Sequence, residues 1–317
     1  MKKKKGLIIL VALLAVFIGL YFVVDSGILE PKPDTDGTQQ DIPEVDLTIT
    51  SWSSPAVRVV LENPDGSYTF DKMTSAGWFC EEYKNYPLNP TRLDEMAAIL
   101  GGMKGTRRLA KNDDNMELFG LNTPEIKVSF ASPTGLSHIL TVGSQNQATT
   151  DYYVYLEGSE YIYMMASSYI DYFKGDIISY VIVPEFPEIL IGDVIRAQLK
   201  SDKADFTATR LTGANEGHEA LMTAINSMYV SSVVDPYTED MAKYGLDTPY
   251  IEVTLNYEHM EGGYSTGEKA FTLKVGDKDP TDDKYRFVTL SDYPNTVYRL
   301  FYMGLERLEQ AEALLAK

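Results

Sequence analysis

Cysteine, histidine and positive charge are scarce in this chain of 317 residues. It holds one cysteine and three histidines, and 28 lysines and arginines against 46 acidic residues. A single cysteine excludes an intrachain disulfide framework and a cysteine-based zinc site. The net charge of −18 argues against a nucleic-acid partner, because such proteins gather cations that displace counterions from phosphate. A hydrophobic fraction of 44% still predicts a globular protein.

Familiar catalytic motifs are absent as well. The sequence contains no phosphate-binding glycine loop of the Walker type and no Gly-x-Ser-x-Gly motif. His138, His218 and His259 lie in separate segments, without the i, i+4 pair of a zinc-binding helix. Cys80, close to Trp78, is typical of a small buried hydrophobic residue. The sequence therefore predicts a protein that is not an enzyme and has no cofactor and no metal.

Two acidic clusters offer alternatives. The first follows Gly276 and comprises Asp277, Asp279, Asp282 and Asp283. Pro280 interrupts the alternate spacing of a calcium loop, so a solvated hairpin loop is favoured over a metal site. The second comprises Asp71, Glu81 and Glu82, which could supply the paired carboxylates of an envelope hydrolase. Glu81 and Glu82 are adjacent, and adjacent residues project to opposite faces of a strand, which weakens the hypothesis of a hydrolase.

The first 24 residues predict a membrane anchor. Lys2–Lys5 form a block of positive charge, and Gly6–Val24 carry no charged side chain. A helix of that length spans about 28 Å, close to the ~30 Å hydrocarbon core. The positive-inside rule places the lysines in the cytoplasm and the rest of the chain outside, as in a single-pass protein of the cell membrane. A cleaved signal peptide ending near Val24 is the alternative.

Residues 25–46 predict a disordered linker. The segment is acidic and proline-containing, with few bulky apolar side chains, so it cannot bury enough surface to order itself. A flexible chain of about 20 residues has an end-to-end distance near ~25 Å. We therefore expect the folded part to be tethered to the membrane without being pressed onto it.

The remaining sequence contains an internal duplication. Phe119–Phe130 recurs as Tyr244–Leu255, with six of twelve residues identical. The match continues downstream, where Leu-x-Val-Gly ends at Gly143 in one copy and at Gly276 in the other. Upstream, three apolar residues recur at the same spacing of 125, namely Met96, Leu100 and Met103 against Leu221, Ile225 and Met228. The period is too long for a solenoid repeat, so we interpret it as two copies of one domain.

The repeated motif has a clear local meaning. Its shared residues are Gly120, Leu121 and Pro124 in the first copy and Gly245, Leu246 and Pro249 in the second. Each glycine can take the left-handed conformation that ends a short helix, and each leucine can fold back beyond it. The residue before each proline is driven into extended geometry. We expect the two short helices to start near Asn112 and at Asp235-Pro236.

The patterns together predict an α+β fold with two tandem copies of a mainly antiparallel sheet domain with short packed helices, after one N-terminal transmembrane helix. Helices are expected at 91–101, at 219–229 and after Tyr302. Strands are expected at the apolar alternations around 126–130, 140–142, 153–156 and 161–164 and their counterparts 251–255, 273–275, 285–290 and 296–300. The expected domains are 47–175 and 176–317, joined within 173–192.

Tyrosine is unusually abundant, with 22 residues. Tyr153 and Tyr155 share one strand face, and Tyr161 and Tyr163 share one face of the next strand. Half-buried rings of ordinary strands explain this pattern. The alternative is an aromatic platform, with Trp78, that binds a glycan or a protein of the cell envelope.

The Gly-Leu-Asn/Asp-Thr-Pro motif, the Leu-x-Val-Gly strand end, the Tyr-rich strand and the single N-terminal span resemble the bacterial family known as domain of unknown function 4340. The resemblance covers roughly residues 50–300. It implies genes that lie beside those of ABC-transporter subunits, including gliding-motility-type exporters, and therefore an accessory role outside the membrane. It implies no catalytic residues. We accordingly expect a non-enzymatic accessory or scaffold protein, with the membrane bound through residues 6–24 and transporter subunits as partners. A binding domain for an envelope ligand is the alternative.

Overall fold

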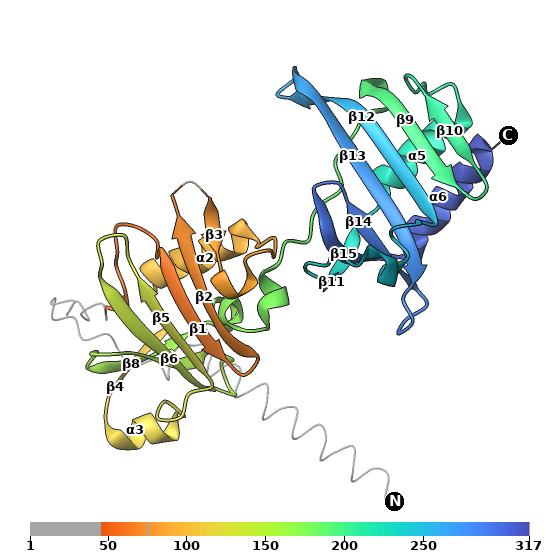
Figure 1. Ribbon diagram of the computed structural model, residues 1–317. Coiled ribbons are helices and arrows are strands. Elements are labelled where there is room, and N and C mark those ends of the chain that lie inside the picture. Colours follow the sequence, from red (N-terminus) through yellow and green to blue (C-terminus); the bar gives the residue numbers. More distant parts are fainter. Residues whose placement is uncertain (1–45, 75, 317) are drawn as a thin grey trace, which may run out of the picture. The chain divides into compact units, whose positions relative to one another are not determined.

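The computed structural model describes residues 46–74 and 76–316 (Figure 1). The expected anchor and nearly all of the linker lie outside these residues. Within the described ranges, no helix has the length and apolar character needed to cross a membrane. The two halves of the folded chain are described below one at a time.

The first half is built on an eight-stranded sheet in which all neighbours are antiparallel. The strands are β1 (Arg58–Asn63), β2 (Gly66–Met73), β3 (Gly77–Phe79), β4 (Arg107–Ala110), β5 (Ile126–Ala131), β6 (Ser137–Gln145), β7 (Tyr152–Leu156) and β8 (Tyr161–Met165). Their spatial order is β3-β2-β1-β5-β6-β7-β8-β4. The edge strands β3 and β4 have three and four residues, which leaves little free edge for another strand to pair with.

The second half is built on a seven-stranded antiparallel sheet. Its strands are β9 (Val194–Ser201), β10 (Asp205–Ala208), β11 (Val230–Asp235), β12 (Ile251–Glu261), β13 (Tyr264–Lys278), β14 (Tyr285–Leu290) and β15 (Tyr293–Phe301). The order is β10-β9-β12-β13-β14-β15-β11. It equals the first order strand for strand once β3 is set aside. The duplication read from the sequence is therefore confirmed at the level of topology.

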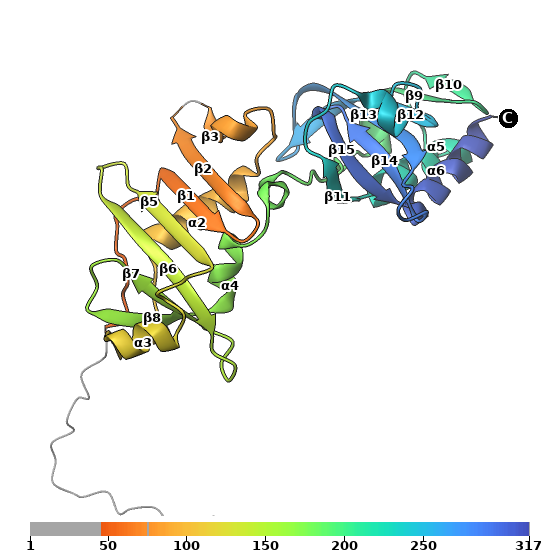
Figure 2. The same ribbon diagram turned by 60° about the horizontal axis from the view of Figure 1, so that its bottom comes forward.

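Helices cover one face of each sheet (Figures 1 and 2). In the first half these are α2 (Pro90–Gly101) and the short α4 (Ser167–Ile170), and in the second they are α5 (Glu216–Ser227) and α6 (Tyr302–Leu315). Each layer pair encloses its own apolar core, one drawn from residues 56–180 and the other from residues 189–311. The predicted helices at 91–101, 219–229 and after Tyr302 are thus present, with shifted ends.

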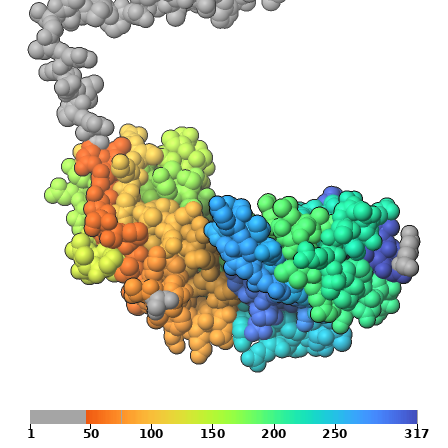
Figure 3. All heavy atoms as spheres, turned by 90° about the horizontal axis from the view of Figure 1, so that it is seen from above, coloured from red at the N-terminus to blue at the C-terminus, as the bar shows by residue number. Residues whose placement is uncertain are grey.

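The chain enters the first half along the helical layer. The N–H groups of Ile49 and Trp52 donate to the carbonyls of Met103 and Gly101, at distances of 2.9 and 2.8 Å. In Figure 3 this segment is the red strip on the surface beside the orange residues. Its backbone closes the end of α2, which has no side-chain cap there.

Three expectations about local structure need correction. Asp235-Pro236 does not start a helix, because Asp235 ends β11, and the short helical turn η5 runs over Met241–Tyr244 with Asp240 as its N-cap. Tertiary pairing of β11 with β15 prevails over the local Asp-Pro signal. The strands β1, β2, β3, β4, β9, β10 and β11 were not expected from the sequence. Ile177 and Tyr180 pack into the first core, beyond the expected boundary at residue 175.

The repeated motif forms the same loop twice. In the first copy the helix α3 (Asp113–Leu118) is followed by Gly120 at φ 70°, and in the second η5 is followed by Gly245 at φ 68°. The N–H of Leu121 donates to the carbonyl of Met116 at 2.9 Å, and that of Leu246 donates to Met241 at 3.0 Å. These are the 6→1 bonds of a Schellman motif, which only a left-handed residue such as glycine completes easily.

The glycine that ends each Leu-x-Val-Gly segment explains why this segment recurs together with the Schellman loop. A Cβ at Gly143 would lie 2.1 Å from the carbonyl oxygen of Phe119 and 3.1 Å from the side chain of Leu121. In the other copy a Cβ at Gly276 would lie 2.1 Å from the carbonyl oxygen of Tyr244. The Schellman loop thus rests directly on β6 in the first copy and on β13 in the second, and a side chain at either glycine has no space.

Candidate functional site

The structure divides the five aromatic residues of the expected platform between two faces. Cross-strand pairing places Tyr153 opposite Met164 and Val154 opposite Tyr163, so Tyr153 and Tyr163 lie on opposite sides of the sheet. Tyr163 is buried in the first core and Tyr161 packs against it. The four tyrosines therefore do not form one surface.

The two outward tyrosines, Tyr153 and Tyr155, are occupied by contacts within the protein. The ring of Tyr153 stacks on that of Phe119, with centroids 3.9 Å apart, and its hydroxyl accepts a hydrogen bond from Asn146. The ammonium of Lys111 lies 4.7 Å from the centroid of the Tyr155 ring and donates to its hydroxyl at 3.0 Å. These contacts raise the pKa of Lys111, through the hydrogen bond first and the charge interaction second.

Trp78 is a core residue, 8% exposed. Its indole Nε1 donates to Oδ1 of Asp94 at 2.8 Å, and the same carboxylate oxygen accepts from Lys72. The pKa of Asp94 is lowered, mainly by the hydrogen bond from Lys72 and then, against some desolvation, by that from Trp78. Trp78 thus ties β3 to α2.

We expect Trp78→Phe to lower the free energy of unfolding by about 1–2 kcal/mol, because it keeps most of the ring but removes the indole donor. Trp78→Ala should cost about 3–5 kcal/mol through the cavity it leaves. Urea unfolding followed by circular dichroism measures both. Unchanged stability in Trp78→Phe would contradict the role assigned to the Asp94 bond.

The other candidate groups lie apart from one another. Cys80 is 1% exposed, and burial raises the pKa of its thiol, as suits a core residue. Asp71 pairs with Arg58 on the exposed face of the sheet, whereas Glu81 and Glu82 lie on a solvent-facing turn. Within residues 46–74 and 76–316, no three His, Cys, Asp or Glu side chains are grouped so as to hold a metal ion.

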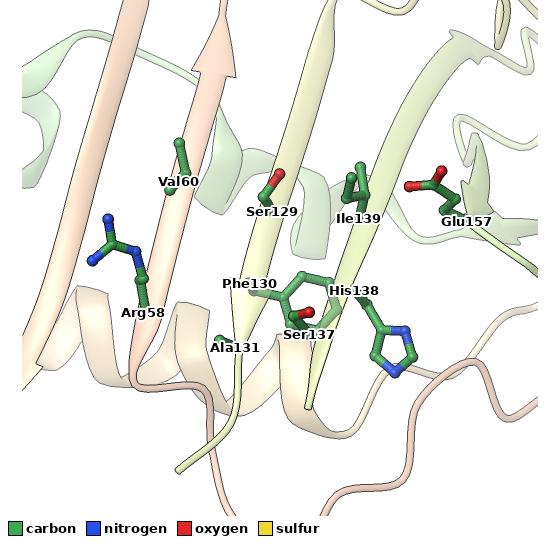
Figure 4. A pocket seen from close by; sticks show the side chains of 9 residues that line it. All are labelled: Arg58, Val60, Ser129, Phe130, Ala131, Ser137, His138, Ile139 and Glu157. Atoms are coloured by element: carbon green, nitrogen blue, oxygen red, sulfur yellow. The ribbon is translucent and has the colours of Figure 1, made fainter. Parts of the chain in front are cut away.

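A groove on the outer face of the first sheet is the best-formed candidate site. It has a volume of about 490 Å³ and crosses β1, β5 and β6. Val60, Ser129 and Ile139 are directly opposite one another on these three strands and form its floor (Figure 4). Arg58, Ala131 and Ser137 form the next row, and Glu157 closes the far side.

Charged side chains and the ends of strands lie around the groove. Nη1 of Arg58 donates to both oxygens of Asp71 at 2.9 Å, in an exposed pair that is worth little to stability. The N–H of Glu157 donates to the carbonyl of Ile139 at 2.9 Å, which continues the sheet to that acid. On the core face His138 stacks on Trp52, with centroids 5.6 Å apart, so this histidine supports the strand end.

The second copy carries polar residues at the two apolar positions of the groove floor. Its equivalent row is Gln198, Thr254 and Thr272, which are opposite one another on β9, β12 and β13. The hydroxyls of Thr254 and Thr272 lie 3.1 Å apart and satisfy each other. Val60 thus stands where the second copy has Gln198, and Ile139 where it has Thr272. The two outward apolar residues of the floor are therefore particular to the first copy.

The groove was not found from the sequence. Val60 lies in a strand that was not predicted, and its place beside Ile139 depends on pairing between distant segments. A comparison of the two copies in the sequence could have pointed to the groove, since Ile139 aligns with Thr272 once both hairpins are matched at Gly143 and Gly276. Chemically, a shallow apolar floor with hydroxyls and opposite charges at its rim fits an extended polypeptide segment.

Comparison with known proteins identifies a family. Neither a curated protein nor a solved structure is matched by the chain. The model of a family described as a domain of unknown function (DUF4340) matches twice, over residues 78–218 and 207–313. The first match runs from β3 into α5 and the second from β10 into α6, so each covers most of one sheet, while β1 and β2 precede the first match and β9 falls within it. The chain therefore belongs to this family, of which it carries two copies in tandem.

Proposed function

We propose that the chain is a non-enzymatic accessory protein, held outside the cell membrane by its N-terminal segment, that docks a partner of an ABC-transporter-type complex on the first copy. The groove on β1, β5 and β6 carries the proposal, because the first copy places Val60 and Ile139 outward where the second copy has polar residues. The tether and the transporter partner are supported by the sequence and by the family resemblance.

An open sheet face suits a protein partner for physical reasons. Apolar side chains on an outer face gain stability only when something covers them, whereas polar ones do not need a cover. Hydroxyls of Ser129 and Ser137 can satisfy the backbone of a bound segment, while Arg58 and Glu157 select its charges. The short strands at both edges of the first sheet leave this face as the larger available surface.

Replacing the two apolar residues of the groove floor by those of the second copy should weaken docking. We expect Val60→Gln with Ile139→Thr to reduce capture of transporter subunits from gently solubilised membranes at least about fivefold, the effect of removing a modest interface hot spot. The reciprocal variant, Gln198→Val with Thr272→Ile, is the matched control and should capture as the natural protein does. Circular dichroism verifies that both variants are folded.

Each result bears on the proposal. Loss of capture in the first variant alone supports docking at the groove. Equal capture by both variants would contradict the groove as the docking site. A natural protein that repeatedly recovers no transporter subunit would contradict the accessory role itself.

A further inference from the structure

A cleft in the second half combines three cations with three tyrosine rings. Its volume is about 540 Å³, and it lies between the start of α6 and the paired strands β13 and β14. The cations are Lys278, Lys284 and Arg286, the rings are those of Tyr250, Tyr285 and Tyr302, and Leu305, Asp283, Glu306 and Glu309 complete the lining. The lining thus carries three cations and three carboxylates, so its formal charges balance, and the placement of the cations decides what the cleft can bind.

The cations are placed against electrostatic preference. Lys278 and Arg286 are directly opposite on β13 and β14, and like charges in that position destabilise a sheet. In the part of the chain that the structure describes, no carboxylate forms an ion pair with Lys278, Lys284 or Arg286. Within the described residues, no ion pair therefore offsets the repulsion between Lys278 and Arg286.

The guanidinium of Arg286 is held in place with one edge unused. Its Nη1 donates to the carbonyl of Gly276 at 2.7 Å, and its plane lies over the ring of Tyr250, 4.0 Å from the centroid. The hydroxyl of Tyr250 in turn donates to Glu309 at 2.8 Å, which fixes the ring. Nε of Arg286 is buried and has no hydrogen-bond partner among the described residues. The edge formed by Nε and Nη2 is the one that binds carboxylate or phosphate through two hydrogen bonds.

The first copy shows that the fold does not require these charges. The pair equivalent to Lys278 and Arg286 is Gln145 and Tyr152, which are opposite each other at the same place in the first sheet. There the nearby cation, Lys174, is neutralised by Asp171 at 2.7 Å and donates to the hydroxyl of Tyr152. The unneutralised arrangement is particular to the second copy.

We propose that this cleft binds an oxyanion, a carboxylate or phosphate group of a small ligand. Arg286 supplies the paired donors, and Lys278 and Lys284 supply further charge. The bound anion relieves the repulsion between β13 and β14 and gives Nε of Arg286 its missing acceptor. The tyrosine rings flank the ligand and favour one with an apolar or sugar face.

Titration of the full-length protein with three probes tests the site. Calorimetry with inorganic phosphate, glucuronate and glucose should show saturable binding of phosphate, glucuronate or both, and none of glucose. Binding should weaken as sodium chloride is added. Phosphate alone would identify a phosphate-bearing ligand, and glucuronate alone a carboxylate. Absence of binding by both anions, or equal binding of glucose and glucuronate, would overturn the proposal.

Variants connect the binding to these residues. Lys278→Gln, at an exposed position, should weaken binding of the anion about tenfold, and Lys278→Glu should abolish it. Arg286→Tyr with Lys278→Gln, the residues of the first copy, should abolish binding while thermal unfolding shows a folded protein. The exposed Lys200→Gln removes one charge elsewhere and should leave the affinity unchanged. Unchanged affinity in both Lys278 variants would also overturn the proposal.

Discussion

Gly143→Ala is expected to lower the free energy of unfolding of the first copy by about 3 kcal/mol or more, the upper range for forcing atoms into a packed site. The added Cβ would lie 2.1 Å from the carbonyl oxygen of Phe119, which already accepts from the N–H of Ser144 at 2.8 Å. Relief of that contact would move either the strand or the Schellman loop. The carbonyl of Phe119 belongs to the backbone, so it cannot rotate away as a flexible side chain can.

The two tryptophans make the measurement specific. Trp52 and Trp78 both pack in or against the first core, so their fluorescence reports the unfolding of that copy. We expect Gly143→Ala to shift the urea midpoint seen by fluorescence. Gly276→Ala, the equivalent change in the second copy, should lower the midpoint seen by circular dichroism and leave the fluorescence midpoint in place.

A control separates crowding from the mere loss of glycine. Gly192 has no atom within 4 Å of the position of a Cβ, so Gly192→Ala should leave stability within about 0.5 kcal/mol of the natural protein. If Gly143→Ala behaves like this control, the close approach of the loop to the strand is not the reason for the repeated glycine.

Arg299→Met is expected to cost about 2–4 kcal/mol, because it leaves a buried carboxylate without its partner. Asp279 is 3% exposed and accepts from Nε of Arg299 at 2.6 Å and from both the N–H and the hydroxyl of Thr281. This acid belongs to the cluster in which a calcium loop was an alternative. In the structure, both of its carboxylate oxygens accept hydrogen bonds, one from Arg299 and the other from Thr281.

The first copy supplies the compensating change. Asn146 makes the same turn, with its side chain accepting from the N–H of Ala148, and Met164 stands where the second copy has Arg299. We therefore expect Asp279→Asn with Arg299→Met to be within about 1 kcal/mol of the natural protein, as when a buried pair is replaced by neutral groups. A double variant as unstable as Arg299→Met alone would contradict this account.

Lowering the pH should weaken the same interaction between Asp279 and Arg299. Burial by itself raises the pKa of Asp279, but the hydrogen bonds from Thr281 and Arg299 outweigh it and hold the pKa below its usual range. A lowered pKa stabilises the fold above the unfolded pKa of about 3.9 and ceases to do so as the pH falls through the folded pKa. The natural protein should therefore lose more stability below about pH 4 than the double variant. Equal losses would indicate that Asp279 is not ionised in the folded state.

Comparison of the copies shows how far local sequence reaches. The Schellman loops and the alternation of β5 and β12 depend on neighbours within a few residues, and each was predictable. Asp235-Pro236 has an equally clear local signal for the start of a helix. That prediction is wrong, because pairing of β11 with β15 decides the conformation there. The strands of the β1–β2 and β9–β10 hairpins were missed, since their pairing with β5 and β12 joins distant segments.

That one fold is built twice follows from local sequence, because a repeated order of glycines, prolines and apolar residues imposes the same local geometry wherever it occurs. Which side chains share a surface depends instead on the pairing of distant strands. Register between distant strands separates Tyr153 from Tyr163, sets Val60 beside Ile139, and holds Lys278 opposite Arg286. A shift of one residue in any of these pairings would turn every side chain of a strand to the other face, so the function of each copy rests on contacts that local sequence does not encode.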